Sequence, residues 1–337
     1  MGRKKFVKAV IVGLCMTMLI LDTKTALQGA KEGLRLCITC IIPSLFPFCV
    51  LSRLMCSMLL GKKLPFGHLL GMPKGTESIF LLSLIGGYPI GAQCIDDAYK
   101  SGAISKNDAQ RLLGFCNNAG PAFLFGIMSC LFPNQRALWC LYIIHIISAV
   151  FVGMLLPNKS RNSCALNPKS GLTLMRSVEE STKSMVAVCS WIILFKIILA
   201  FILHWFGWFL DPISYAAVAG FLELSNGCIA LQNVQNHGVR FILASAFLAL
   251  GGGCVALQTV SVTKNCGIGA YYTGKLLQCF ISLMLAAVVQ MFVFSKNDIF
   301  GAPQYILLVG CSCTLSLLIF LYKTKNVWNL RKKSCRI

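Results

Sequence analysis

Charged residues are scarce in this 337-residue sequence, and acidic ones are the scarcest: 12% of residues are charged and only 11 are Asp or Glu. A soluble protein of this length would need far more charged surface. No low-complexity or linker-like segment is long enough to separate a soluble domain. We therefore expect residues 1–337 to form a single membrane domain.

The short motifs of common enzymes are also missing. The sequence has no Walker glycine loop with a lysine, no GxSxG and no HExxH. The acidic pair Asp96-Asp97 is followed by Tyr99-Lys100 at an expected helix end, where a solvated or capping role is the better interpretation. We therefore do not expect an enzyme, and no cofactor is implied.

Metal-binding patterns are weak. The four histidines are scattered and show no ligand spacing. Most of the eighteen cysteines lie inside apolar runs, where cysteine is usually a small hydrophobic residue. Cys37 and Cys40 have the spacing of a redox or metal pair, but a lone CxxC in an apolar helix is poor evidence. We expect no metal site.

Apolar stretches of about twenty residues recur from end to end, as in a chain that crosses a hydrocarbon core of about 30 Å several times. This pattern predicts an all-α polytopic membrane protein. The predicted segments are Phe6–Leu21, Leu36–Leu60, Ser78–Ala98, Ala119–Phe132, Ala137–Leu156, Met185–Phe209, Ile213–Leu231, Phe241–Val262, Thr273–Phe294 and Tyr305–Tyr322. The first could also be read as a signal peptide, but further segments follow it, which favours a membrane helix.

The net charge of +20 resides in the tails and connecting loops. We interpret it as positive-inside topology and affinity for lipid headgroups, not as a nucleic-acid surface. Attraction of an anionic solute is the alternative. The basic N-tail, the central loop near Lys159 to Lys183 and the C-tail should all be cytoplasmic. Five segments lie in each half, so parity requires at least one in each half to enter and leave on the same side.

The segments that could re-enter contain glycine runs. The first contains Gly86-Gly87-Tyr88-Pro89-Ile90-Gly91 and the second Gly251-Gly252-Gly253. Glycine and proline disfavour a helix interior, and broken backbone survives in a bilayer only where protein or a water-filled cavity satisfies its polar groups. We predict a broken or re-entrant helix in each half. Tight packing on a glycine face is the alternative.

The two halves also match each other. An offset of 165 residues pairs Gly86 with Gly251, Gly87 with Gly252 and Gln93 with Gln258, and a weaker match pairs Lys31–Ile42 with Lys183–Leu194. We therefore expect two repeats, residues 31–156 and 183–322. They would be inverted under the predicted topology, as in many alternating-access transporters, and broken helices at matching positions point to a binding site.

Polar side chains inside apolar segments are costly, so each needs a reason. Glu223 is either a hydrogen-bonded structural acid or a coupling or ligand site, and Asn226 follows it by one helical turn. Lys196 either forms an internal ion pair, with Glu223 as a candidate partner, or balances an anionic solute. Asn117 and Asn118 precede Gly120-Pro121 as helix caps or as ligands.

Helices that restart inside a membrane would point unpaired N–H groups at one cavity, which favours a small anionic solute. Gln93 and Gln258, just after each glycine break, could donate to a carboxylate. The expected solute-binding residues are Gly86, Gly87, Tyr88, Pro89, Gly91, Gln93, Asn117, Asn118, Lys196, Glu223, Asn226, Gly251, Gly252, Gly253 and Gln258.

Three stretches, residues 86–93, 109–121 and 220–227, together with Leu250–Gln258, resemble the YlbJ-type sporulation integral membrane proteins. This family is grouped with nucleoside-recognition "gate" proteins. The resemblance implies a role in endospore formation, as a carrier that moves dipicolinate out of the mother cell across the outer forespore membrane. A non-transporting membrane scaffold needed for spore maturation is the alternative. The sequence leaves the coupling ion and the oligomeric state open, a homo-oligomer included.

Overall fold

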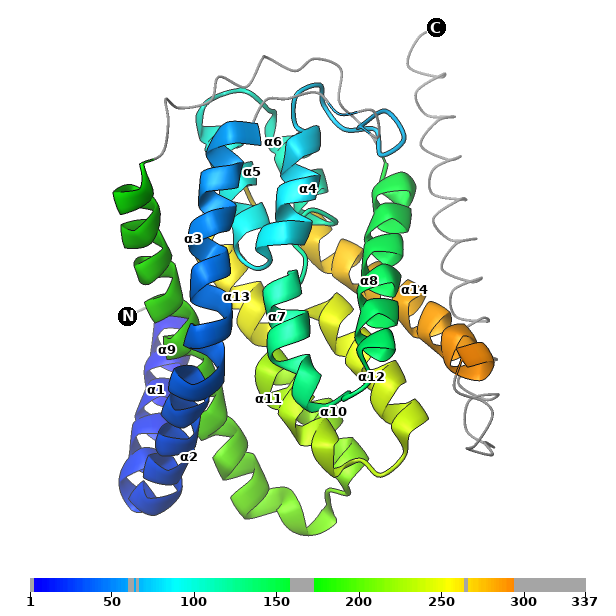
Figure 1. The fold of residues 1–337 in the computed structure, drawn as a ribbon. Helices are drawn as coiled ribbons and strands as arrows, with labels where there is room; N and C mark the ends of the chain where they lie inside the picture. Colours follow the sequence, from blue (N-terminus) through cyan, green and yellow to red (C-terminus); the bar gives the residue numbers. More distant parts are fainter. Residues whose placement is uncertain (1–2, 60–63, 65–66, 158–172, 264–265, 294–337) are drawn as a thin grey trace, which may run out of the picture.

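The computed structural model describes residues 3–59, 64, 67–157, 173–263 and 266–293, and every regular element among them is a helix (Figure 1). The α-helices are α1 (Arg3–Leu21), α2 (Thr23–Leu36), α3 (Ile42–Leu59), α4 (Glu77–Gly86), α5 (Ile90–Lys100), α6 (Lys106–Leu113), α7 (Pro121–Gly126), α8 (Gln135–Leu155), α9 (Leu174–Phe206), α10 (Pro212–Leu222), α11 (Leu224–Ala230), α12 (His237–Leu250), α13 (Gly252–Val262) and α14 (Gly269–Val293). A π-helical turn, η1 (Cys37–Ile41), joins α2 to α3, and 3-10 turns follow α7, α9 and α11.

Five helical runs are long and apolar enough to cross a membrane: Thr23–Met55, Gln135–Leu155, Leu174–Phe209, His237–Val262 and Gly269–Met291. The predicted all-α class and the predicted segments from Leu36 to Phe294 are confirmed in outline. The second and sixth predicted segments, Leu36–Leu60 and Met185–Phe209, begin earlier in the structure, because α2 and the start of α9 are polar, amphipathic extensions of apolar helices. The predicted segment Tyr305–Tyr322 lies outside the described residues.

The same order of elements occurs twice along the described chain. A long helix (α2–α3 or α9) is followed by two short helices that pack against each other (α4 with α5, α10 with α11). Two further short helices follow that make little contact with each other (α6 and α7, α12 and α13), and then a second long helix, α8 or α14. Corresponding long helices run in opposite directions in Figure 1: α3 and α8 run upward, whereas α9 and α14 run downward.

A glycine with positive φ ends a short helix at each of the two predicted glycine runs. Gly87 follows α4 with φ +73°, and Gly251 follows α12 with φ +76°, a left-handed conformation that glycine adopts without a steric cost. None of these short helices has the roughly 20 residues needed to cross the hydrocarbon core alone. Gly87 lies inside a packed pair, whereas Gly251 lies in a pair whose members do not pack together, so the 165-residue offset relates breaks of different kinds.

A further break, which the sequence analysis missed, separates α10 from α11 at Glu223. Its backbone is extended (φ −148°, ψ 126°), and its carboxylate caps α11 by accepting from the N–H groups of Ser225 at 2.9 Å and Asn226 at 2.7 Å. Glutamate, unlike glycine or proline, does not indicate a helix break. The sequence analysis therefore predicted Ile213–Leu231 as one uninterrupted segment. The helices on the two sides of this break, α10 and α11, nevertheless pack against each other.

The long helices α2 and α9 pack closely through a pair of glycines. A Cβ atom added to Gly29 would lie 2.9 Å from the Cα of Ile197, and one added to Gly33 would lie 2.9 Å from the Cα of Ile193. Helices in a membrane gain little from the hydrophobic effect when they pack together, so close approach and van der Waals contact help to hold α2 against α9. The Gly-x3-Gly spacing on α2 provides that approach.

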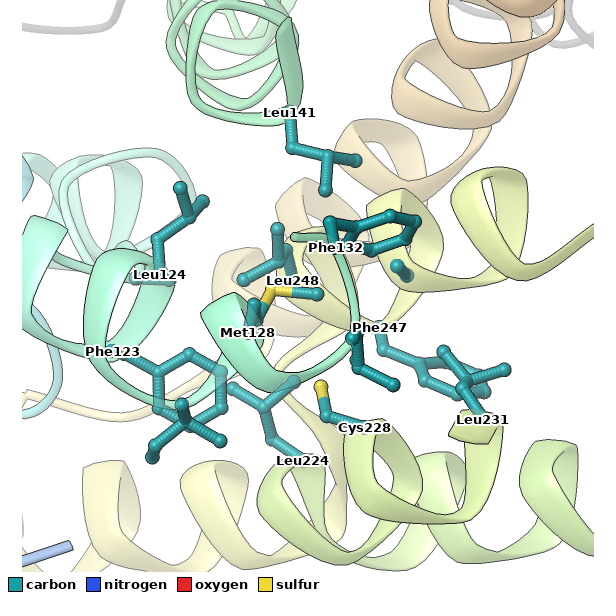
Figure 2. Close-up of a cluster of buried hydrophobic side chains, with 14 of the residues drawn as sticks. Phe123, Leu124, Met128, Phe132, Leu141, Leu224, Cys228, Leu231, Phe247 and Leu248 are labelled. Atoms are coloured by element: carbon teal, nitrogen blue, oxygen red, sulfur yellow. The ribbon is translucent and has the colours of Figure 1, made fainter. Parts of the chain in front are cut away.

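The largest apolar cluster joins the two halves of the chain (Figure 2). Phe123 and Leu124 of α7 and Leu141 of α8 meet Cys228 of α11 and Leu248 of α12, and all five are buried. Residues of the first half therefore pack on the short helices of the second half. This packing holds α7 beside α11.

Candidate functional site

The turn between α4 and α5 is pressed against the linker between α6 and α7. A Cβ atom on Gly87 would lie 2.9 Å from the backbone nitrogen of Gly120, and one on Gly91 would collide with the carbonyl oxygen of Cys116. The backbones meet here without side chains between them. The same kind of contact occurs in the second half, where a Cβ atom on Gly252 would lie 2.9 Å from the carbonyl oxygen of Gly220. In each half, a packed helix pair and a broken helix thus touch through glycine.

A cavity of about 50 Å³ lies where these elements converge. That volume holds a few water molecules. Its wall is mostly apolar, but Glu223, Gln258, Ser184 and Ser225, which carry polar side chains, are among the lining residues. The other lining residues are Ile41, Leu45, Cys49, Gly86, Gly87, Tyr88, Pro89, Gly120, Ala122, Phe123, Met185, Val188, Ile192, Leu224 and Val255.

Six of the fifteen predicted site residues line this cavity: Gly86, Gly87, Tyr88, Pro89, Glu223 and Gln258. Gln93 lies just outside it, with its amide nitrogen 3.4 Å from the hydroxyl of Ser184 in the wall. The glycines at 251–253 do not line it. They pack instead against Tyr88 and against the backbone of α10 and its junction with α11. The glycines of the second break therefore pack against residues of the cavity wall without forming part of it.

The predicted site residues Asn117 and Asn118 are fully buried and do not line the cavity. Both side chains form hydrogen bonds to other helices. The Asn117 amide donates to the hydroxyl of Thr259 on α13 at 2.8 Å. The Asn118 amide donates to the carbonyl of Phe115 at 2.7 Å, and its oxygen accepts from Gln278 at 3.1 Å. These asparagines hold the α6–α7 linker against the second half.

Asn226 lies in α11 beside Glu223 and is 3% exposed. Neither polar atom of its side chain has a hydrogen-bond partner among the described residues. An unpaired amide in a buried position is costly, so this side chain is available to a water or a ligand.

Lys196 does not pair with Glu223. Its ammonium lies 3.3 Å from a carboxylate oxygen of Glu32 on α2, and its side chain is 19% exposed. The α2–α9 contact at Gly33 brings the two residues together. The sequence suggested Glu223 because both residues lie in apolar segments, whereas Glu32 lies on the polar face of an amphipathic helix.

The most deeply buried cation was missed by the sequence analysis. Lys275 of α14 is 2% exposed, and its ammonium lies 2.9 Å from the amide oxygen of Gln278 and 3.4 Å from the hydroxyl of Tyr88. That tyrosine in turn donates to the carbonyl of Leu248 at 3.0 Å. No described acidic side chain forms an ion pair with Lys275. Lys275 lies only two residues inside the predicted segment Thr273–Phe294, and the sequence analysis did not consider it.

Arg53 was also missed, although it lies inside a predicted apolar segment. Its guanidinium bonds to Glu180, Gln93 and Ser184, and its side chain is 13% exposed. The rule that marked Glu223 and Lys196 as costly intramembrane charges applies equally to Arg53. Cys37, whose spacing from Cys40 was judged poor evidence of a pair, donates its thiol to the carbonyl of Cys189 at 3.8 Å.

The five long apolar helices and the short apolar helices between them define a multi-pass helical membrane protein. The chain is similar to Sporulation integral membrane protein YlbJ of Bacillus subtilis (strain 168), with 28% identity over 121 residues. The match covers 34% of this chain and 30% of that relative, so it spans less than a third of the relative's length. No family model and no solved structure matches the chain.

Proposed function

We propose that this protein is a membrane carrier of a small anionic solute, with dipicolinate as the leading candidate, exported from the mother cell towards the forespore during sporulation. Its membrane would then be the outer forespore membrane. The observation that carries the proposal is the cavity at the junction of α4–α5, α10–α11 and α13, whose mostly apolar wall includes Glu223, Gln258, Ser184 and Ser225. The similarity to a sporulation integral membrane protein supports the biological setting.

The carrier is built, in this proposal, from two inverted repeats whose correspondence follows the order of elements. α2–α3 corresponds to α9, α4–α5 to α10–α11, α6–α7 to α12–α13, and α8 to α14. The opposite directions of the long helices support this pairing, as do the glycine contacts that each packed pair makes with the broken helix of its own half. The weaker match of Lys31–Ile42 with Lys183–Leu194 agrees with it. The packed pairs would be the re-entrant elements.

Glu223 has a specific place in this proposal. The N–H groups at the start of α11 bind its carboxylate, so they are not free to hold a solute. A carboxylate in the wall would repel an anion unless a proton or a cation accompanied it. We therefore assign Glu223 to coupling, with its capping of α11 as a structural role of the same side chain.

A membrane scaffold is the second candidate, and the tightness of the cavity favours it. A space for a few waters is far below the roughly 300–1,000 Å³ of most ligand pockets, so a solute as large as dipicolinate needs the helices to separate. Lipid is the surrounding partner in either case. A catalytic role and a cofactor are not part of the proposal, because the described cavity wall contains a single carboxylate, Glu223, and no histidine.

Uptake of labelled dipicolinate into proteoliposomes tests the proposal. Gly87→Val and Gly252→Val should each abolish uptake, because a branched side chain would meet backbone atoms at 2.9 Å and both glycines have positive φ. Gly102→Val is the matched control: that glycine also has positive φ (+73°), but no atom lies within 4 Å of an added Cβ. Wild-type-like uptake by both break variants at equal membrane levels would exclude the cavity as the route, and absence of uptake by the wild type would favour the scaffold.

A further inference from the structure

Three helices each place a polar residue one helical turn beyond the cavity wall, all at the same end. Arg53 on α3 follows the lining residue Cys49, Gln93 on α5 follows the lining residue Pro89, and Glu180 on α9 precedes the lining residue Ser184. Residues four apart share a helix face. These side chains therefore form a polar cap over one end of the cavity.

Arg53 is the centre of this cap. One terminal nitrogen of its guanidinium, Nη1, lies 3.1 Å from Oε2 of Glu180. The other, Nη2, donates to the amide oxygen of Gln93 at 2.8 Å and to the hydroxyl of Ser184 at 2.6 Å. Its Nε is buried and has no partner among the described residues. The guanidinium thus reaches the cavity wall at Ser184 and still has an unused donor.

Glu180, by contrast, lies near the protein surface. It is 35% exposed and its second carboxylate oxygen lies 3.1 Å from Nε of Arg176, which is 66% exposed. One acid is therefore shared between a half-buried arginine and an exposed one. If a carboxylate of a solute takes the place of Glu180 on Arg53, the guanidinium stays paired and Glu180 keeps Arg176 as its partner, so the exchange leaves no buried charge without a counter-charge.

We infer that Arg53 is the carboxylate-binding residue of the carrier and that its pair with Glu180 closes one end of the cavity. A carboxylate of the solute replaces that of Glu180 on the guanidinium, whose planar fork binds carboxylates through two parallel hydrogen bonds. The exchange opens the cap and brings the solute to Ser184. The inference rests on the proposed function and supplies the cation that the cavity wall itself lacks.

The test measures dipicolinate uptake by the full-length protein in proteoliposomes and equilibrium binding of labelled dipicolinate to the purified protein. Arg53→Gln should raise both KM and Kd at least tenfold, which corresponds to about 1.4 kcal/mol. Glu180→Gln should lower Kd, since it removes the competing carboxylate, and a misfolded protein would not bind more tightly. Lys183→Gln is the matched control, because it removes an exposed cation of the same helix that pairs with Glu179 and takes no part in the cap, and it should leave Kd within twofold.

Arg53→Lys separates charge from geometry: it should recover part of the affinity, because a lysine keeps the charge and loses the fork. Wild-type Kd in Arg53→Gln, with uptake intact in the wild type, would overturn the role of Arg53 and leave the carrier standing. Equal losses of affinity in Arg53→Gln and Lys183→Gln would also overturn the role of Arg53, because they would indicate a general effect of surface charge. If the wild type neither binds nor transports dipicolinate, picolinate or benzoate, the inference and the anion carrier both fail.

Discussion

At the scale of single residues, the buried and half-buried charges of this protein are balanced in different ways. Lys196 pairs with Glu32, Arg53 pairs with Glu180, and Glu223 is held by backbone N–H groups. Lys275 has only neutral partners among the described residues. Burial of an ammonium without an anion is costly, so this lysine is retained for a reason other than stability.

Replacing Lys275 with methionine should therefore leave the protein at least as stable as the wild type. Methionine fills a similar volume, while Tyr88 keeps its bond to Leu248 and Gln278 keeps its bond to Asn118. Thermal unfolding in detergent gives the melting temperature. Lys183→Met, at an exposed lysine paired with Glu179, is the control and should change little. A large fall in melting temperature for the Lys275 variant alone would mean that the lysine stabilises the fold.

At the scale of helices, close approach between elements depends on where glycine occurs. The contact between α2 and α9 uses Gly29 and Gly33, and the contacts around the cavity use Gly87, Gly120 and Gly252. The sequence marks the breaks at Gly87 and Gly251 because glycine and proline act locally on the backbone. It does not mark the break at Glu223, because that break depends on a side chain that caps the next helix.

A branched residue at Gly29 should separate α2 from α9. Its Cβ would lie 2.9 Å from the Cα of Ile197 and 3.2 Å from the carbonyl oxygen of Lys196, and backbone atoms cannot move aside as a flexible side chain can. Overpacking of this kind typically costs about 1–3 kcal/mol. We expect Gly29→Val to lower the melting temperature, whereas Gly13→Val on α1, where no atom lies within 4 Å, should not. An equal effect of the two substitutions would contradict the close contact.

At the scale of the whole molecule, hydropathy predicts the class and most of the long helices, since membrane spans follow from composition and length alone. It predicts α8 almost to the residue, because both ends of that helix adjoin polar loops. Hydropathy does not predict which polar residues contact each other. Arg53 and Glu180 are 127 positions apart, and Gln278 and Asn118 are 160 apart. Such pairs depend on how the two halves pack.

The size of the cavity predicts how the whole molecule responds to a solute. A space of about 50 Å³ cannot hold dipicolinate, so binding must move helices, and we expect the short helices to move while the long ones stay in place. Hydrogen–deuterium exchange of the purified protein should then change on addition of dipicolinate in α4–α5 and α10–α11, and remain constant in α8 and α9. Pyridine, which lacks carboxylates, is the control ligand and should change neither. Exchange that changes evenly over all helices, or only in α1, would mean that the solute does not enter between the two halves.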